Sequence, residues 1–600
     1  MISRRIFFSI CILMMAILML FQFSIVGRDL ANNYDENIHM TDTELSSADV
    51  VNAQSLGKAA QTVLYIGSED DASCDIVRQW CDYTRRNFVQ YNSLDEYTPL
   101  GGGGKALLLC LSGKSVTTSG QVDALSAMVQ DGQDVLLCDM PDTAMLRQLP
   151  ILRALLGIRS IESESVELIG IHLFSGFLLG DEVIYSMEEE SENHNKEIHL
   201  FAPWYTRLSG TKSYMAGMLA DEDVENEDRP SLIWRNSYGK GRVFVINGPY
   251  MQDETGLGIL SAALHEMQEY TLYPVVNAQN LSVANFPILA LENTNELMDI
   301  YARDMHHLQS NLMWPDMILS AGRGRYKLTS FLSPRYNYNE QADLQTGTLI
   351  FYLKQFREQS AEAGLSLDYM PGTTLQDKLN EDQVFFDSSD SKFPYSAAYI
   401  GSTDKEAFEA TQPQGILENI RTITGTWDNT DILSYCTDTI TAQKATADGF
   451  EHTYQQDLRV RAIETALGYS NILLDMKRIA WPEEDDFHWE VLSEIYSSNI
   501  NTHWRPFYDF EKTTLTESDE RVRSFFALDY AEKRKKNTIS VEIKNDGESW
   551  FLLRTHAEKI KSITGGDYTK VENDVYLIHA TEKSVQIELE QWQKKRYYVQ

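Results

Sequence analysis

The sequence predicts an α/β multidomain protein: an N-terminal transmembrane helix, a parallel-sheet domain, an irregular β/α barrel and a C-terminal β-sandwich. Three patterns lead to this fold class. An apolar run opens the chain, buried strands alternate with amphipathic helices through its middle, and strands of alternating apolar and polar residues close it. Strand–helix alternation is typical of parallel sheets covered on both faces, whereas period-two alternation is typical of half-buried strands.

The N-terminal run predicts where the protein lies. Arg4 and Arg5 precede the apolar segment 6–26, and Arg28 follows it. About 20 apolar residues cross a bilayer, and arginines before the run favour a cytoplasmic N-terminus. Since no small-x-small cleavage pattern follows, a retained anchor is favoured over a cleaved signal peptide. We therefore expect a single-pass cell-membrane protein with an anchor at 1–28, a polar tether at 29–58 and its bulk outside the cytoplasm.

Composition narrows the classes of partner. The chain has 88 acidic and 52 basic residues, a formal net charge of −36, which argues against nucleic acid as a partner. The hydrophobic fraction of 43% and the 30 tyrosines are those of a folded chain. Five of the six cysteines follow the anchor without the spacing of a disulfide framework or a zinc ribbon.

The first predicted domain spans residues 59–275. Its segments "VLYIG", "ALLLCLSG", "DALSAMVQDGQDVLLC" and "YGKGRVFVINGPY" resemble those of class I glutamine-amidotransferase-like domains, which implies a flavodoxin-like parallel sheet. In catalytic members the nucleophilic cysteine stands on a glycine-flanked elbow. Cys138 lies near that place, but its neighbours Leu137, Asp139 and Met140 cannot form such an elbow. We expect a non-catalytic module.

The second predicted domain, residues 276–530, alternates helices and short strands as an irregular β/α barrel. Through "FPILALENTNE" and "EAGLSLDY" it resembles NodB-type polysaccharide deacetylase barrels. The resemblance implies an Asp-Asp pair after the first strand and a His-x-x-x-His motif after a later one, which together hold a metal ion that activates water. Here the matching positions are Glu292, Asn293 and Asn295 in the first strand region and Asp368 in the second.

From these positions we expect catalytic roles for Glu292 and Asp368, with His503 as a late histidine that assists the leaving group. Asn293, Asn295 and Trp504 are the candidate ligand-binding residues. Because the family's metal set is missing, no metal or cofactor is expected. The alternative is a divalent ion, Ca²⁺ or Mg²⁺, held by the oxygens of Glu292 and Asp368. For His503 and Trp504 the competing interpretation is ordinary packing among neighbouring aromatic residues.

Residues 537–600 alternate apolar and polar positions and predict a small β-sandwich. The whole arrangement resembles an uncharacterised bacterial family associated with Pel-type exopolysaccharide clusters. That resemblance implies a non-catalytic, polysaccharide-handling or scaffold component in the synthesis, modification or export of a surface exopolysaccharide. Its partners would be that polysaccharide, including a cationic amino-sugar polymer, and the synthesis or export proteins. The alternative from another class is an atypical metal-dependent deacetylase or glycan hydrolase.

The predicted topology has a direct test. A reporter enzyme that is active only outside the cytoplasm, fused after Gln600, should be active, since a single N-terminal span leaves the C-terminus outside. The matched control is the same fusion with segment 6–26 deleted, which should be inactive. Activity of a cytoplasm-specific reporter at the same position would contradict the assignment.

Overall fold

The computed structural model describes residues 61–97, 105–186, 198, 200–220, 228–340, 342–389, 393–401, 408, 415–483 and 487–591. The expected anchor and tether lie outside these ranges. Within them, no helix is both long and apolar enough to cross a membrane.

The first module is a mixed nine-stranded sheet. Its strands are parallel from β2 to β11 and antiparallel from β11 to β7. In spatial order they are β2 (Asn87–Tyr91), β1 (Thr62–Ile66), β3 (Leu108–Leu111), β4 (Val135–Leu137), β11 (Gly241–Ile246), β10 (Ser231–Tyr238), β9 (Lys212–Met218), β6 (Gly170–Leu173) and β7 (Val183–Ser186). A separate two-stranded sheet joins β5 (Ile158–Leu168) to β8 (Leu200–Arg207).

Alternate residues of this sheet enter two different cores. Tyr65 packs with α2 (Ala72–Tyr83) and α6 (Thr255–Met267), whereas its neighbour Leu64 packs with α3 (Ser119–Asp131) and α5 (Pro150–Leu156). The short helix α4 (Thr143–Gln148) precedes α5. Burial on both faces is what the continuous apolar runs predict for parallel strands.

The second module is built on a barrel-like row of parallel strands. In chain order the strands are β13 (Ala278–Ala284), β14 (Leu328–Leu332), β15 (Glu362–Ser366), β16 (Ala397–Tyr399), β17 (Thr422–Gly425), β19 (Thr441–Lys444), β20 (Ala447–Asp448) and β21 (Tyr469–Asp475). Segment 441–448 pairs first with β17 and then with β21, which itself pairs with β13. The two ends of the row therefore meet. The antiparallel β18 (Leu433–Tyr435) and the short β22 (Lys512–Thr513) pair with β19 and β13.

Helices connect these strands. They are α7 (Thr294–Tyr301), α8 (Met305–Leu308), a π-helical turn at Gln309–Met313, α9 (Trp314–Gly324), α10 (Thr346–Glu358), α11 (Leu375–Ser388), α13 (Tyr454–Leu467), α14 (Lys477–Ala480), α15 (Trp489–Trp504) and α16 (Leu515–Ala527). Helix α16 closes the end where the strands begin, because Ser518 donates to Gln443 at 2.6 Å and Asp519 accepts from Thr441 at 2.6 Å. The opposite end carries the strand-end side chains.

The C-terminal module is a sandwich of two four-stranded sheets. One sheet has the order β23 (Tyr530–Lys535), β24 (Thr538–Ile543), β29 (Ser584–Gln591) and β26 (Glu558–Thr564). The other has β12 (Tyr270–Val275), β25 (Ser549–Thr555), β28 (Val575–Ala580) and β27 (Gly566–Glu572). Strand β12 belongs to the segment between the first two modules, so the sandwich is completed by a strand from far upstream. It also begins at Tyr530, seven residues before the boundary expected at 537.

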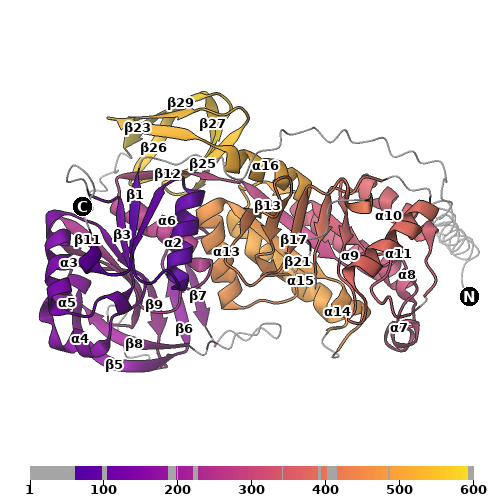
Figure 1. Cartoon of the computed structure of the whole chain (residues 1–600), viewed down its shortest axis with the longest axis horizontal. Helices are drawn as coiled ribbons and strands as arrows, with labels where there is room; N and C mark the ends of the chain where they lie inside the picture. The colour runs from indigo at the N-terminus through magenta and orange to yellow at the C-terminus, as the bar shows by residue number, and fades with distance from the viewer. Residues whose placement is uncertain are drawn as a thin grey trace, which may run out of the picture.

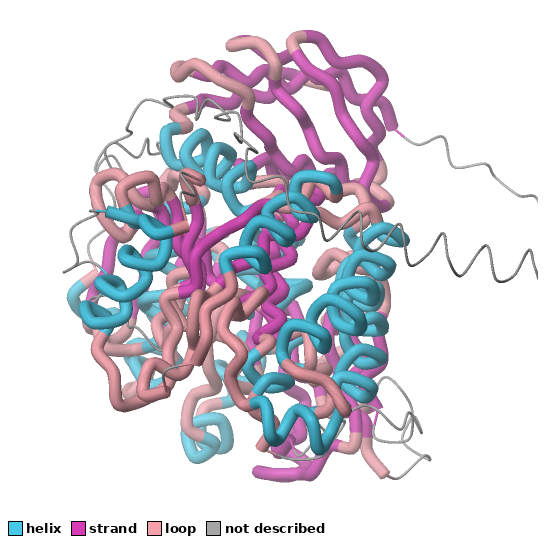
Figure 2. The backbone as a smooth tube through the Cα atoms, turned by 90° about the vertical axis from the view of Figure 1, so that its right-hand side faces the viewer, coloured by secondary structure: helices cyan, strands magenta, loops and turns pink. Residues whose placement is uncertain are grey.

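The three modules pack closely (Figure 1). The first module lies at one end, the barrel-like module at the other, and the sandwich lies against both. Figure 2 shows the sandwich as a layer of its own, with a helix between it and the other strands. Helices α6 and α13 meet at Gly258, where an added Cβ would lie 2.4 Å from the Cα of Ala462. Glycine at this position lets the first two modules approach backbone to backbone.

Arg85 ties the first module to α16. It is 1% exposed, and its guanidinium donates to the carbonyls of Leu528, Asp82, Tyr83 and Phe525. Burial lowers the pKa of Arg85 to about 10, so the group stays charged at neutral pH. Its removal leaves the buried carbonyls of Leu528 and Tyr83 without the guanidinium donor.

We expect Arg85→Met to lower the free energy of unfolding by about 3 kcal/mol, since each orphaned buried acceptor costs roughly 1–3 kcal/mol. Urea denaturation followed by circular dichroism measures this loss. Arg78→Met on the same helix is the matched control, because Arg78 makes an exposed ion pair with Asp75 at 2.7 Å, and such pairs contribute about 1 kcal/mol or less. Equal effects of the two substitutions would contradict the role assigned to Arg85.

Candidate functional site

Polar side chains gather where the parallel strands of the second module end. Asn285 follows β13 directly, Asp368 lies two residues after β15, and Asp475 and Asp448 are the last residues of β21 and β20. The carboxyl ends of parallel strands meet at one end of a barrel, which is where such folds place their ligands. We call the group Asn285, Asp368, Asp475 and Lys477 the strand-end site.

One amide and one ammonium group join the two carboxylates of this site. Asn285 Nδ2 donates to Asp368 Oδ2 at 3.0 Å and to Asp475 Oδ1 at 2.8 Å. Lys477 Nζ lies 3.1 Å from an oxygen of each carboxylate. Ser366 Oγ donates to Asn285 Oδ1 at 2.7 Å, which fixes the amide orientation. Asn285 has φ 55°, a left-handed conformation that asparagine tolerates better than most residues.

The electrostatic state of the site follows from these contacts. Asp368 is fully buried, whereas the Lys477 side chain is 35% exposed. Burial alone would lower the pKa of Lys477, but the carboxylates of Asp475 and Asp368 raise it above its ordinary value. Lys477 is therefore a permanent cation between two carboxylates, and the three groups together carry one net negative charge.

Glu292 holds the loop that borders the site. It is 1% exposed, and its carboxylate accepts from the backbone N–H groups of Tyr336 at 3.1 Å and Asn337 at 3.2 Å. Burial raises the pKa of Glu292 to about 7, although these two N–H groups act to lower it. The ring of Tyr336 packs on Trp481 with centroids 4.7 Å apart. Glu292 thus positions the aromatic pair Tyr336–Trp481 at the rim of the site.

The other residues expected from the first strand region lie outside this cluster. Asn293 has φ 50° and donates from its amide to Glu296 at 2.6 Å and to the carbonyl of Ala480 at 2.9 Å. Asn295 is exposed in the first turn of α7. Strand β13 ends at Ala284, before the segment where the sequence placed the strand end.

His503 and Trp504 lie in the last turn of α15, away from the strand-end site. His503 is fully buried; its ring stacks on that of His452, and its Nδ1 lies 3.6 Å from Asp457 Oδ1. Trp504 Nε1 donates to Ser470 at 2.8 Å. Ser470 is near the start of β21 and Asp475 is at its end, which separates them by roughly 16 Å at the usual rise per residue. Trp504 is 1% exposed and packs as a core residue.

The strand-end residues do not fit the divalent ion that the deacetylase resemblance implies. Within the described ranges, no three His, Cys, Asp or Glu side chains are grouped so as to hold a metal ion. At the strand-end site the Lys477 ammonium already occupies the space between the two carboxylates, where a cation would be coordinated. Among the described residues, histidine does not take part in the contacts of this site.

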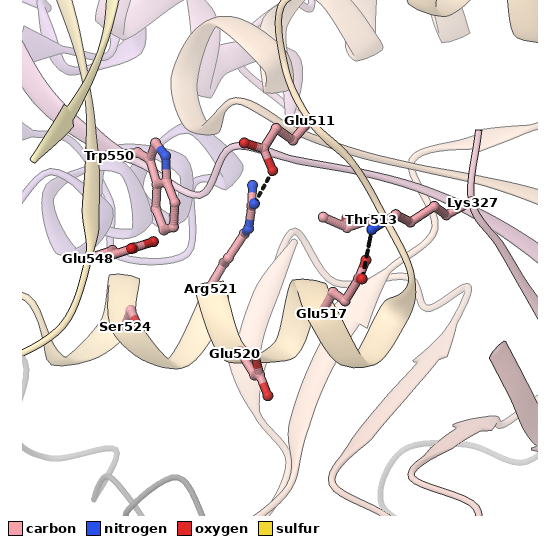
Figure 3. Close-up of a pocket in the computed structure, with 9 residues that line it drawn as sticks. All are labelled: Lys327, Glu511, Thr513, Glu517, Glu520, Arg521, Ser524, Glu548 and Trp550. Atoms are coloured by element: carbon pink, nitrogen blue, oxygen red, sulfur yellow. Dashed lines mark hydrogen bonds and ion pairs between the residues drawn. The ribbon is translucent and has the colours of Figure 1, made fainter. Parts of the chain in front are cut away.

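A second concave region lies between α16 and the sandwich (Figure 3) and measures about 360 Å³. Four glutamates line it, but two of them are already paired: Lys327 contacts Glu517 at 2.7 Å, and Arg521 pairs with Glu511. Its aromatic residue, Trp550, has Arg521 over its ring at 4.6 Å and His579 stacked at 5.1 Å. Trp550 is 8% exposed, so little of its ring is available for stacking on a sugar.

Cys138 of the first module is not presented as a nucleophile. It is 2% exposed, and its backbone N–H donates to Leu111 at 2.8 Å, which continues the regular sheet. The backbone at Gly113 is packed against the segment that follows Cys138, since an added Cβ would lie 2.5 Å from the carbonyl oxygen of Asp139. A buried structural thiol is the role that this geometry supports.

Sequence reasoning missed Asn285, Asp475, Lys477 and Tyr336. In "NLSVANFPILALE" the apolar run continues past the true strand end, so the asparagine before Phe286 looked like an interior residue. Asp475 did carry a usable signal, because a lone acidic residue closes the buried strand "SNILL". Tyr336 comes from a loop, and the sequence holds no pattern that places it.

Comparison with known proteins supports the overall architecture. Residues 180–368 match a family model described as an uncharacterised protein conserved in bacteria (DUF2194). No curated protein matches the chain. The crystal structure of Agd3, described as a novel carbohydrate deacetylase, matches with a TM-score of 0.51 and 11% identity over 89% of this chain and 99% of that one. This likeness shows a shared fold.

Two shorter matches carry no inference. A cytoplasmic protein of Salmonella typhimurium LT2 has a TM-score of 0.24 and 10% identity, over 35% of this chain and 100% of its own. A β-galactosidase from Bacillus circulans sp. alkalophilus has a TM-score of 0.22 and 11% identity, over 36% and 33%. The resemblances to amidotransferase-like domains and to the Pel-associated family stay predictions.

Glu292 predicts a pH dependence of stability. A carboxyl group whose pKa is raised on folding, from about 4.5 to about 7, stabilises the fold fully below pH 4.5 and loses that contribution as pH rises through 7. We expect the stability of the wild type relative to Glu292→Gln to fall by about 2–3 kcal/mol between pH 4.5 and 8. Glu340→Gln, at an exposed glutamate nearby, is the control. Parallel stability curves for wild type and Glu292→Gln would contradict the assignment.

Proposed function

We propose that this chain is a membrane-anchored, extracytoplasmic protein that binds a surface polysaccharide at the strand-end site. It acts as a non-catalytic, polysaccharide-handling component in the synthesis, modification or export of that polymer. The fold shared with a carbohydrate deacetylase supports a carbohydrate ligand. The apolar segment 6–26 and the excess of acidic residues support an anchored ectodomain.

The observation that carries the non-catalytic role is the state of Asp368. A general base must reach the substrate, but this carboxylate is fully buried and held by Asn285 and Lys477. Partly exposed groups around it suit binding instead. Lys477 can donate to sugar hydroxyls, Asp475 can accept from them, and the Tyr336–Trp481 pair offers an aromatic face to the C–H groups of a sugar ring.

The charge of the site indicates which polymers fit it. Asp368, Asp475 and Lys477 leave one net negative charge, within a chain of net charge −36. A neutral or cationic glycan, such as a partly deacetylated amino-sugar polymer, is favoured over an acidic one by this field.

The second candidate is an atypical deacetylase or glycan hydrolase. One observation favours it: Asp368 and Asp475 both accept from the same Asn285 nitrogen, so these carboxylate oxygens lie at most about 6 Å apart. Paired carboxylates at roughly 5–9.5 Å are the machinery of glycoside hydrolysis. The complete burial of Asp368 weighs against this use.

We expect Trp481→Ala to weaken binding of amino-sugar and N-acetylated oligosaccharides at least tenfold, since an aromatic anchor in a binding site contributes on the order of 2 kcal/mol. Calorimetric titration of the full-length protein measures the change. Trp204→Ala is the matched control, because Trp204 is a partly exposed tryptophan on β8 whose Nε1 donates to Asp228; its affinity should be that of the wild type.

The same preparations decide between the two functions. Release of acetate or of shorter oligosaccharides by the wild type, abolished in Asp368→Asn with the protein still folded, would establish the enzyme and overturn the non-catalytic role. Unchanged binding in Trp481→Ala would show that the polymer binds elsewhere.

A further inference from the structure

A cavity of about 290 Å³ lies between the first module and the barrel-like module. On one side is β7, the edge strand of the nine-stranded sheet, with Ile184 and Tyr185. On the other are the start of α13, with Tyr454 and Asp457, and Thr502 of α15. Its volume is several times the roughly 30 Å³ that one water occupies in the liquid, so it has room for a small organic molecule. We call it the interdomain cavity.

Asp457 gives this cavity an ionised acceptor. It is 4% exposed, and its Oδ2 accepts from Tyr185 Oη at 2.6 Å and from Arg461 Nε at 2.8 Å. Although burial acts to raise it, the pKa of Asp457 is held well below its usual range by His503, Arg461 and Tyr185. The other oxygen, Oδ1, lies 3.6 Å from His503 Nδ1, the neighbour it has among the described residues. This distance is too long for a hydrogen bond.

His503 behind Asp457 is similarly short of partners. The residue is fully buried, and neither ring nitrogen has a hydrogen-bond partner among the described residues. A buried polar group left without a partner costs roughly 1–3 kcal/mol. Here the unpartnered imidazole of His503 lies next to Asp457 Oδ1, which also lacks a close hydrogen-bond donor in the part of the chain that the structure describes. This arrangement is expected where a bound molecule completes the hydrogen bonds.

The remaining walls define the chemistry of that molecule. Tyr185 and Tyr454 stand with ring centroids 6.0 Å apart and planes tilted by 51°, which forms an aromatic corner. His452, which also lines the cavity, stacks on His503 with the two planes within 15°. Because the lone pairs of imidazole lie in the ring plane, stacked rings do not converge on one metal ion. Aromatic faces can pack against the C–H groups of a sugar, and a carboxylate beside them can accept hydrogen bonds from its hydroxyl groups. Together these are the features of a sugar pocket.

We propose that the interdomain cavity is a second carbohydrate site. It binds one sugar residue, whose hydroxyl groups donate hydrogen bonds to Asp457 and whose ring contacts Tyr185 and Tyr454. This site is separate from the strand-end site and does not depend on it. Residues of two modules line it, so the ligand also bridges β7 and α13.

The test uses the imidazole NMR signals of His452 and His503 in the full-length protein, labelled at histidine. These two rings lie at the interdomain cavity and not at the strand-end site, so their signals report on this cavity alone. Titration with glucose, galactose, mannose and N-acetylglucosamine should shift both signals in a saturable way for at least one sugar. If none of the four sugars shifts them, the proposal is wrong, whatever binds at the strand-end site.

Two blocking variants locate the binding. Thr502 is exposed on α15 and its hydroxyl donates to the carbonyl of Ser498 one turn earlier, so Thr502→Phe should fold normally and fill the cavity. Asn501→Phe, at the neighbouring exposed position that bonds to Ser497 in the same way, is the matched control. We expect at least a tenfold loss of affinity in Thr502→Phe and none in Asn501→Phe.

Ile184→Trp should also fill the interdomain cavity, from the wall opposite Thr502. Ile184 lies on β7 and is 50% exposed. This second variant keeps the test decisive should Thr502→Phe fail to fold. Retention of wild-type sugar affinity in a folded blocking variant would overturn the proposal.

Discussion

The structure of the second module depends on neutralising one fully buried carboxylate, Asp368. An isolated ionised carboxylate cannot be taken out of water without partners, and loss of one partner of a buried pair typically costs 3–5 kcal/mol. Lys477 and Asn285 supply those partners, from α14 and from the residue after β13. The two strand ends are thereby fixed relative to β15. Because the buried charge of Asp368 must be compensated, the ammonium group of Lys477 lies between the two carboxylates. The position of this ammonium group in turn limits the chemistry that the site can perform.

The modules are joined by shared elements as well as by contact. Strand β12 leaves the first module, pairs with β25 of the sandwich and then leads into β13, so one sheet of the sandwich takes its edge strand from the segment between the other two modules. Gly258 brings α6 against α13, and Arg85 binds the carbonyls at the end of α16. The interdomain cavity lies where this packing leaves space, between β7 and α13.

The sequence predicted the order of the modules better than the site. The spacing of apolar residues and the local composition identify buried strands such as 62–66. A short, continuous apolar run bounded by polar residues is typical of a buried strand. The position of a strand end is harder. In residues 278–291 the apolar run passes through the end of β13, and the choice of Glu292 over Asn285 shifted the expected site by seven residues. Asp368 was correctly placed after the end of its strand, because that strand ends clearly. Lys477 was missed because only a contact between distant segments distinguishes it from any surface lysine.

Ion pairs of Arg478 connect the surroundings of the two proposed sites. Arg478, next to Lys477, binds Asp448 at 2.6 Å and Glu451 at 3.3 Å, and Glu451 precedes His452 at the interdomain cavity. A chain of sugars held at the strand-end site and again at the interdomain cavity gains affinity from the high effective concentration of its second unit. Two such proposed sites would suit a protein that holds a long polymer and releases it, whereas an enzyme needs one site matched to a transition state. The ion pair that holds Asp368 and the proposed second site therefore both fit the proposed role in handling a polymer.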